Sequence, residues 1–134
     1  MPVARENSRS GESLPRRERL CRREDFRRCY KKGRRKYGSH LTLYFVAGRC
    51  ANARFGMTVS RKVGRAVVRA KLKRRFREIY RRWPRRKDLP PLDMVIHAKP
   101  SAASASFEEL RQDLALGLLQ ALEKKGGARR QERH

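Results

Sequence analysis

The chain has 134 residues and is strongly basic, with 37 Lys and Arg against 13 Asp and Glu and a formal net charge of +24. This length fits one domain, and the 38% of hydrophobic residues, which fall in periodic runs, excludes a wholly disordered basic chain. A compact state with this charge repels itself, so a polyanion is expected against it. Nucleic acid fits best because neutralised phosphates release their counterions.

The first predicted element follows a polar segment. Residues 1–17 are rich in Arg, Ser and Glu without a hydrophobic period, so we expect a basic, mobile tail. The next segment, 22–32, has helical spacing, and Gly33 is placed to end that helix. The apolar face of the predicted helix consists of Phe26, Cys29 and Tyr30.

Two segments with strand periodicity come next. In the first, 41–46, the alternating residues are Leu41, Leu43 and Phe45 on one face and Thr42, Tyr44 and Val46 on the other. In the second, 54–60, Phe55, Met57 and Val59 alternate with polar or small residues. Residues 48–52 fit a hairpin connection, so the two strands are expected to pair with each other in antiparallel fashion.

The longest predicted helix covers 65–83 and is stopped by Pro84. Its apolar stripe consists of Val68, Leu72, Phe76, Ile79 and Trp83. A strand is expected over 93–99, followed by a helix that begins near Ser106, where Ser106 and Glu109 fit a capping box.

This order of elements indicates a small α+β layer fold. We expect the last helix to end at Gly126-Gly127, and we place the folded domain at 18–125 and a second basic tail at 126–134.

Cationic side chains recur along the helix predicted over 65–83. Opposite the apolar stripe, at every fourth position, we place Arg65, Arg69, Lys73, Arg77 and Arg81, and Lys71, Arg74 and Arg75 widen this surface. Only Glu78 interrupts it. A merely solvent-facing helix is the alternative, but such a face commonly mixes signs, since like charges four residues apart cost about 0.2–0.5 kcal/mol per pair. We therefore interpret the surface as a phosphate-binding face.

A longer pattern joins this helix to the strand before it. It reads Arg54-Phe55-Gly56-Met57-Thr58-Val59-Ser60-Arg61-Lys62-Val63-Gly64, then Ala66-Val67-Val68-Arg69-Ala70-Lys71-Leu72-Lys73-Arg74 and Arg77-Glu78. Upstream stand Arg19-Leu20, Asp25-Phe26, Tyr30 and Gly33, and downstream stand Asp93-Met94-Val95-Ile96 and Ala98-Lys99. Together these residues resemble the bacterial ribonuclease P protein component over 19–122. One departure is Ala70, where the family has Asn, so that a side-chain amide is missing here.

The resemblance implies a two-layer sandwich of order α-β-β-(β)-α-β-α, with a mixed central sheet and a left-handed β-α-β crossover. It also implies a protein subunit of ribonuclease P, an endoribonuclease that removes the 5′ leader of precursor tRNA and generates the mature 5′ end. The expected partners are the catalytic RNA and precursor tRNA. The family's catalyst is its RNA subunit with bound Mg²⁺, so no catalytic side chain, no protein-bound metal and no obligate protein partner is expected.

The resemblance also assigns two sets of site residues. Expected to bind the RNA subunit are Arg61, Lys62, Arg65, Arg69, Lys71, Lys73, Arg74 and Arg77. Expected to bind the single-stranded leader, in a cleft between the first helix and the sheet, are Phe26, Tyr30, Thr42 and Tyr44. Their aromatic rings suit stacking on unpaired bases, at about 1–3 kcal/mol each. For Phe26, core packing is an equally good interpretation, whereas Tyr30 and Tyr44 favour a functional one.

The remaining candidate ligands are scattered. The cysteines are Cys21, Cys29 and Cys50, and the histidines are His40, His97 and His134. Without C-x-x-C spacing they predict reduced, partly buried thiols in a cytoplasmic protein rather than a zinc site. Three carboxylates are interpreted as isolated, with surface or capping roles: Asp25, Glu78 and Asp93. No long apolar stretch and no apolar N-terminal signal segment is present, so no membrane association is expected.

Charge alone leaves other functions open. A structural RNA-binding protein of the ribosomal type follows the same charge logic without a processing role, and so does a general nucleic-acid chaperone. A metal-dependent nuclease that acts alone is the third alternative.

Overall fold

A computed structural model describes residues 14–123 of the chain. Its elements are η1 (Arg16–Glu18), α2 (Arg23–Lys32), β1 (Arg34–Tyr37), β2 (Leu41–Ala47), β3 (Arg54–Thr58), α3 (Ala66–Arg82), η2 (Arg86–Asp88), β4 (Leu92–Ala98), η3 (Pro100–Ser104) and α4 (Phe107–Glu123). The strands form one mixed sheet in the order β1-β2-β4-β3. The predicted α+β class and mixed sheet are confirmed.

The predicted hairpin between β2 and β3 is wrong, because β4 lies between them. β2 pairs antiparallel with β4, and β3 pairs parallel with β4. β4 is buried at every position except His97, and a strand with so continuous an apolar run fills a central place in a sheet. The connection over 48–53 passes this strand, with the Gly48 amide donating to the Pro91 carbonyl at 2.9 Å. The six residues easily span two strand spacings of about 5 Å each.

The optional third strand in the order that the resemblance implied is present, but no periodicity located it at edge strand β1. Its sequence, Arg-Arg-Lys-Tyr, has no apolar alternation, and it pairs antiparallel with β2 along the open side of the sheet. Cationic residues are common in such edge strands because their charge opposes pairing with another chain.

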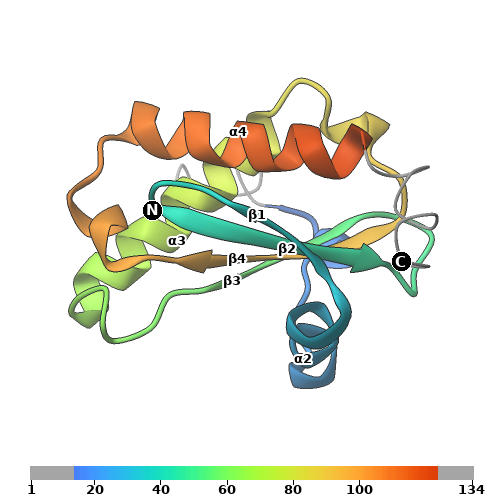
Figure 1. The fold of residues 1–134 in the computed structure, drawn as a ribbon, viewed down its shortest axis with the longest axis horizontal. Coiled ribbons are helices and arrows are strands. Elements are labelled where there is room, and N and C mark those ends of the chain that lie inside the picture. The colour runs from blue at the N-terminus through green and yellow to red at the C-terminus, as the bar shows by residue number, and fades with distance from the viewer. Residues whose placement is uncertain (1–13, 124–134) are drawn as a thin grey trace, which may run out of the picture.

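Helices α3 and α4 cover one face of the sheet, and α2 packs against the other (Figure 1). The strand residues of the main core are Leu41, Leu43, Phe45, Phe55, Met94 and Ile96, and the helix residues facing them are Leu72, Phe76, Ile79, Leu110, Leu114 and Leu118. The apolar stripe predicted for α3 is therefore confirmed. The rings of Phe55 and Tyr80 stack in parallel with centroids 4.2 Å apart, which fixes α3 on β3.

On the opposite face, α2 buries a smaller cluster of Leu20, Cys29 and Val95. Four further side chains pack on this cluster and stay partly exposed: Phe26, Tyr30, Tyr44 and Val46. Because α2 covers only part of this face (Figure 1), aromatic rings remain accessible beside it.

The connection between parallel strands β3 and β4 runs through α3, as the resemblance implied, while its left-handedness stays a prediction. The capping box of α4 is confirmed, since the Ser106 amide donates to Glu109 Oε1 at 2.9 Å and the Glu109 amide donates to Ser106 Oγ at 3.1 Å.

The folded part begins earlier than predicted. Leu14 is only 1% exposed and belongs to the main core, so residues 14–17, assigned from sequence to the tail, are part of the domain. The rest of the N-terminal tail and the predicted helix end at Gly126-Gly127 lie outside the described residues. Within 14–123, none of the helices combines the length and apolarity needed to cross a membrane.

Candidate nucleic-acid interface

The cationic ridge of α3, which is the row of Arg65, Arg69, Lys73, Arg77 and Arg81, flanks the buried stripe instead of lying opposite it. Arg69, Lys73 and Arg77 are half-buried, whereas Lys71 and Arg74 are exposed on the outer side of the helix. The prediction of an opposite face was wrong because a step of four residues advances about 40° beyond one turn of 3.6 residues. Over four steps the ridge therefore winds around the helix and borders the sheet.

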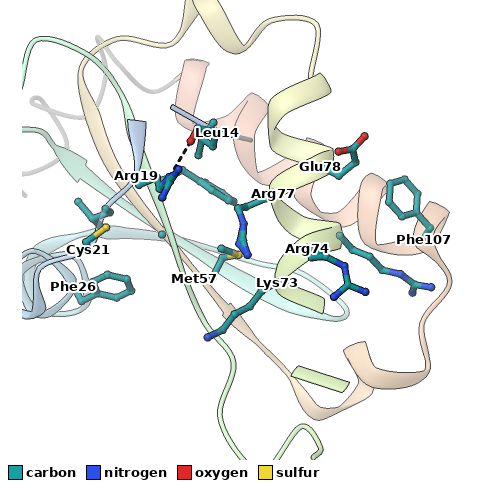
Figure 2. Close-up of a pocket in the computed structure, with 14 residues that line it drawn as sticks. Leu14, Arg19, Cys21, Phe26, Met57, Lys73, Arg74, Arg77, Glu78 and Phe107 are labelled. Atoms are coloured by element: carbon teal, nitrogen blue, oxygen red, sulfur yellow. Dashed lines mark hydrogen bonds between the residues drawn. The ribbon is translucent and has the colours of Figure 1, made fainter. Parts of the chain in front are cut away.

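A broad cleft of about 790 Å³ lies where this ridge meets β3 and the segment before α2 (Figure 2). The cations that line it are Arg19, Lys73, Arg74, Arg75 and Arg77. Its apolar lining includes Phe26, Phe55, Met57 and Phe107. A concave surface that combines several cations with aromatic rings suits both the phosphates and the bases of a nucleic acid.

The charges in this cleft repel one another. Burial, together with the positive charges of Arg19 and Arg74, lowers the pKa of Arg77 from its usual value. The carboxylate in the lining, Glu78, is engaged by two residues of its own helix, Arg81 at 3.1 Å and Arg82. Glu78 thus neutralises cations of its own helix and not Arg77. An anion bound near Arg77 would supply the missing negative charge.

The eight residues predicted to bind the RNA subunit occupy one continuous segment, which runs from the turn before α3 to the start of the fourth turn of the helix. Arg61, Lys62 and Arg65 are exposed at its start. Arg69 also has a structural contact, because its Nε donates to the Gly64 carbonyl at 3.1 Å. Ala70 is exposed on the outer side of the same segment, where the family's amide would face solvent.

Three of the residues predicted to bind the leader, Phe26, Tyr30 and Tyr44, pack on the same cluster beneath α2. Tyr30 and Tyr44 meet edge to face with ring centroids 4.6 Å apart, and Phe26 also lines the cleft of α3. Thr42 shares the face of Tyr44 but is only 5% exposed, which leaves it little surface for a ligand.

Tyr30 is fixed by neighbours from two strands that the sequence did not connect with it. Its hydroxyl donates to Thr58 Oγ1 at 2.8 Å and lies 3.1 Å from His97 Nδ1. Burial raises the pKa of Tyr30, so the phenol keeps its proton at neutral pH. The ring is thus held in one orientation at the border of α2 and the sheet.

Beneath this surface lies a buried ion cluster, which corrects the interpretation of Asp25 and Asp93 as isolated carboxylates. Asp93 is fully buried and contacts Arg28 and, at 2.9 Å, Arg54. Asp25 is 3% exposed and lies 3.3 Å from Arg54. The sequence separations of 39 and 65 residues hid these pairs. Among residues 14–123 no group of three potential metal ligands comes together.

A mixed sheet with a basic helix on one face and accessible aromatic rings on the other defines a small α+β protein whose surfaces suit nucleic acid. The family model described as Ribonuclease P matches residues 14–122. The ribonuclease P protein component of Desulfovibrio desulfuricans is 44% identical over 101 residues, which cover 73% of this chain and 76% of that protein. The corresponding protein of Microcystis aeruginosa is 36% identical over 117 residues, which cover 81% of this chain and 93% of that protein. The chain therefore belongs to the bacterial ribonuclease P protein component family.

Solved structures agree with this assignment. The ribonuclease P protein of Staphylococcus aureus superposes with a TM-score of 0.70 at 28% identity, covering 78% of this chain and 94% of that one. The Thermotoga maritima protein superposes with a TM-score of 0.67 at 30% identity, covering 81% of this chain and 99% of that one. As a subunit of ribonuclease P, the chain partners the RNA of that ribonucleoprotein.

Proposed function

We propose that this protein binds the catalytic RNA of ribonuclease P through α3 and binds the single-stranded 5′ leader of precursor tRNA through the aromatic face beside α2. By holding both polyanions, it promotes endonucleolytic removal of the leader and formation of the mature tRNA 5′ end, in the cytoplasm. The observation that carries the proposal is the division of binding chemistry between two surfaces: cations gather along α3, and Tyr30 and Tyr44 meet beside α2.

The α3 surface has the properties that phosphate contacts require. Exposed cations at Arg61, Lys62, Arg65, Lys71 and Arg74 carry no ion pair to a carboxylate of residues 14–123. Such side chains exchange condensed counterions for the RNA backbone and gain affinity from the counterions released.

The α2 face has the properties that unpaired bases require. Tyr30 and Tyr44 are half-buried, so each ring keeps one part in the protein and another part accessible. An aromatic ring recognises any base through its π-face, which suits a leader whose sequence differs between tRNA precursors. Phe26 lies between the two surfaces and contributes to the cleft of α3.

Bond cleavage is assigned to the RNA subunit and its Mg²⁺ ions. A metal ion activates water and stabilises the leaving oxygen in such reactions. The protein's contribution is electrostatic: its cations replace part of the Mg²⁺ that two polyanions otherwise need in order to stay together.

Two variants of the full chain test the division between surfaces. We expect Lys73→Glu with Arg74→Glu to weaken binding to the RNA subunit, and Tyr30→Ala with Tyr44→Ala to weaken holoenzyme binding to precursor tRNA but not to mature tRNA. The matched control for the first is Lys87→Glu with Arg111→Glu, two exposed cations outside α3. Equal loss for precursor and mature tRNA in the tyrosine variant would refute the leader assignment. Equal effects of the two charge reversals would refute the role of α3.

A further inference from the structure

We infer that the leader-binding face continues past Tyr44 onto edge strand β1, where Arg35 binds a phosphate of the single-stranded RNA. This inference rests on the proposed leader-binding function and adds a residue that the sequence pattern did not mark. Arg35 and Tyr37 both lie in this short basic strand.

The register of the sheet places β1 on the same binding face. Arg35 is paired with Tyr44, and Tyr37 is paired with Thr42, whose next partner across β2 and β4 is His97. Directly paired residues point to the same side of a sheet. The face that carries Tyr30 and Tyr44 therefore extends across the whole sheet to its β1 edge.

Arg35 is held in position by two aromatic neighbours. Its guanidinium carbon lies 5.6 Å from the ring centroid of Tyr44, within the range of a cation–π interaction. Its Nη1 donates to the Tyr37 hydroxyl at 2.9 Å. A guanidinium fixed in this way loses less conformational entropy when it binds a ligand than a free side chain does.

The guanidinium has unused capacity for an anion. It carries five N–H donors, and one of them is used by the Tyr37 hydroxyl. Arg35 is exposed, and within residues 14–123 no carboxylate lies at ion-pair distance from it. The free donors suit the paired oxygens of a phosphate, which a guanidinium binds with two parallel hydrogen bonds.

The geometry favours RNA over a protein strand at this edge. A β-strand added to β1 would have to pair beside Arg34, Arg35 and Lys36, whose charges oppose that association. A nucleotide whose base contacts Tyr44 instead brings its own phosphate toward the adjacent guanidinium. Stacking and phosphate binding then act on the same nucleotide.

A double-perturbation experiment tests the contact in the reconstituted holoenzyme. Precursor tRNAs carry a single neutral methylphosphonate at successive leader linkages, and their affinities are compared for the wild type and Arg35→Gln. We expect Arg35→Gln to weaken binding of the unmodified precursor about tenfold, as loss of a charge-assisted hydrogen bond does. One methylphosphonate position should weaken the wild type similarly and have no further effect on the variant. Arg49→Gln, an exposed arginine in the β2–β3 connection, is the control and should change nothing.

Failure of the Arg35 contact and failure of leader binding itself give different outcomes. If Arg35→Gln binds every precursor like the wild type, or weakens mature tRNA equally, the phosphate contact is refuted. If the variant still loses affinity at every linkage that affects the wild type, the contact is also refuted. If Tyr30→Ala with Tyr44→Ala leaves the preference for precursor intact in the same assay, the leader-binding function itself fails.

Discussion

Arg54 donates through Nε and Nη2 to the two carboxylate oxygens of Asp93, each at 2.9 Å, and Asp93 has no exposed surface. Arg28 of α2 contacts the same carboxylate, so Asp93 joins β3, β4 and α2. Cys29 of α2 also donates its thiol to the Asp93 carbonyl at 3.5 Å, and Tyr30 and Tyr44 pack on the cluster that contains Cys29, so the accessible aromatic face lies beside this junction. The position of α2, and with it the position of Tyr30, depends on the cluster.

Asp93→Asn should therefore destabilise the fold strongly. The substitution leaves two largely buried guanidinium groups without a full countercharge, and breaking a buried pair in this way costs about 3–5 kcal/mol. Urea unfolding measures the loss. Asp88→Asn, which breaks the exposed pair with Arg85 at 3.3 Å, is the control and should cost at most about 1 kcal/mol. Equal losses for the two variants would show that the cluster is not a stabilising junction.

Gly56→Ala should disturb the cleft between α2 and α3. An added Cβ would lie 2.7 Å from Cζ of Phe26 and 3.0 Å from the Leu20 carbonyl oxygen, so the ring has to move. Overpacking of this kind costs about 1–3 kcal/mol. Thermal unfolding of Gly56→Ala, Phe26→Ala and the double variant measures the coupling. We expect the glycine substitution to cost less when Phe26 is already truncated, and strictly additive losses would contradict the contact.

Cys29 should resist alkylation while Cys21 and Cys50 react. Burial and then the nearby charge of Asp93 raise the pKa of the Cys29 thiol to about 12, whereas the other two cysteines are exposed. Only the thiolate is an effective nucleophile. Treatment with iodoacetamide at pH 8 followed by mass spectrometry should show two modified thiols in the native protein and three after denaturation. Rapid modification of Cys29 in the native state would contradict its burial.

The same thiol predicts the sign of a pH effect on stability. The unfolded chain releases the proton of Cys29 near pH 9, whereas the folded chain retains it to about pH 12. The contribution of the protonated Cys29 thiol to the free energy of unfolding is therefore fully present below pH 9 and is lost as the pH rises from 9 to 12. We expect Cys29→Ala to flatten the fall in unfolding free energy over this range, measured by urea titration. An unchanged slope would show that the thiol does not titrate differently in the two states.

Salt dependence should report how many phosphates α3 contacts. Each phosphate neutralised on duplex RNA contributes about 0.9 to the slope of log affinity against log salt, taking duplex DNA as the guide. Lys73→Glu with Arg74→Glu should lower the slope for the RNA subunit by roughly two. Fluorescence anisotropy over a salt series measures it. A variant with lower affinity and the wild-type slope would indicate loss of folding instead of loss of phosphate contacts.

Features that depend on local spacing were predictable from the sequence. The stripe from Leu72 to Ile79 and the capping box of Ser106 with Glu109 follow from helical periodicity, and the structure confirms both. The resemblance added the mixed sheet and the α3 crossover, which no periodicity contains. The stripe and the capping box need no knowledge of tertiary contacts, whereas the sheet and the crossover came from the family.

Features that depend on tertiary contacts were not predictable in this way. β4 lies between β2 and β3 because both of its faces are buried. The short connection from β2 to β3 looks the same in sequence whether the two strands pair with each other or with a third strand between them. The pairing of Arg54 with Asp93 spans 39 residues. Arg35 has no apolar neighbours in sequence, so its place over Tyr44 becomes visible only in the register of β1 and β2.

Whether the protein assists an RNA catalyst is decided by cleavage of precursor tRNA at low Mg²⁺ by the RNA subunit alone, the protein alone and the reconstituted pair. We expect the protein alone to cut nothing, the RNA alone to be nearly inactive, and the two together to cleave at the mature 5′ end. Cleavage by the protein alone, or no stimulation of the RNA subunit, would contradict this expectation.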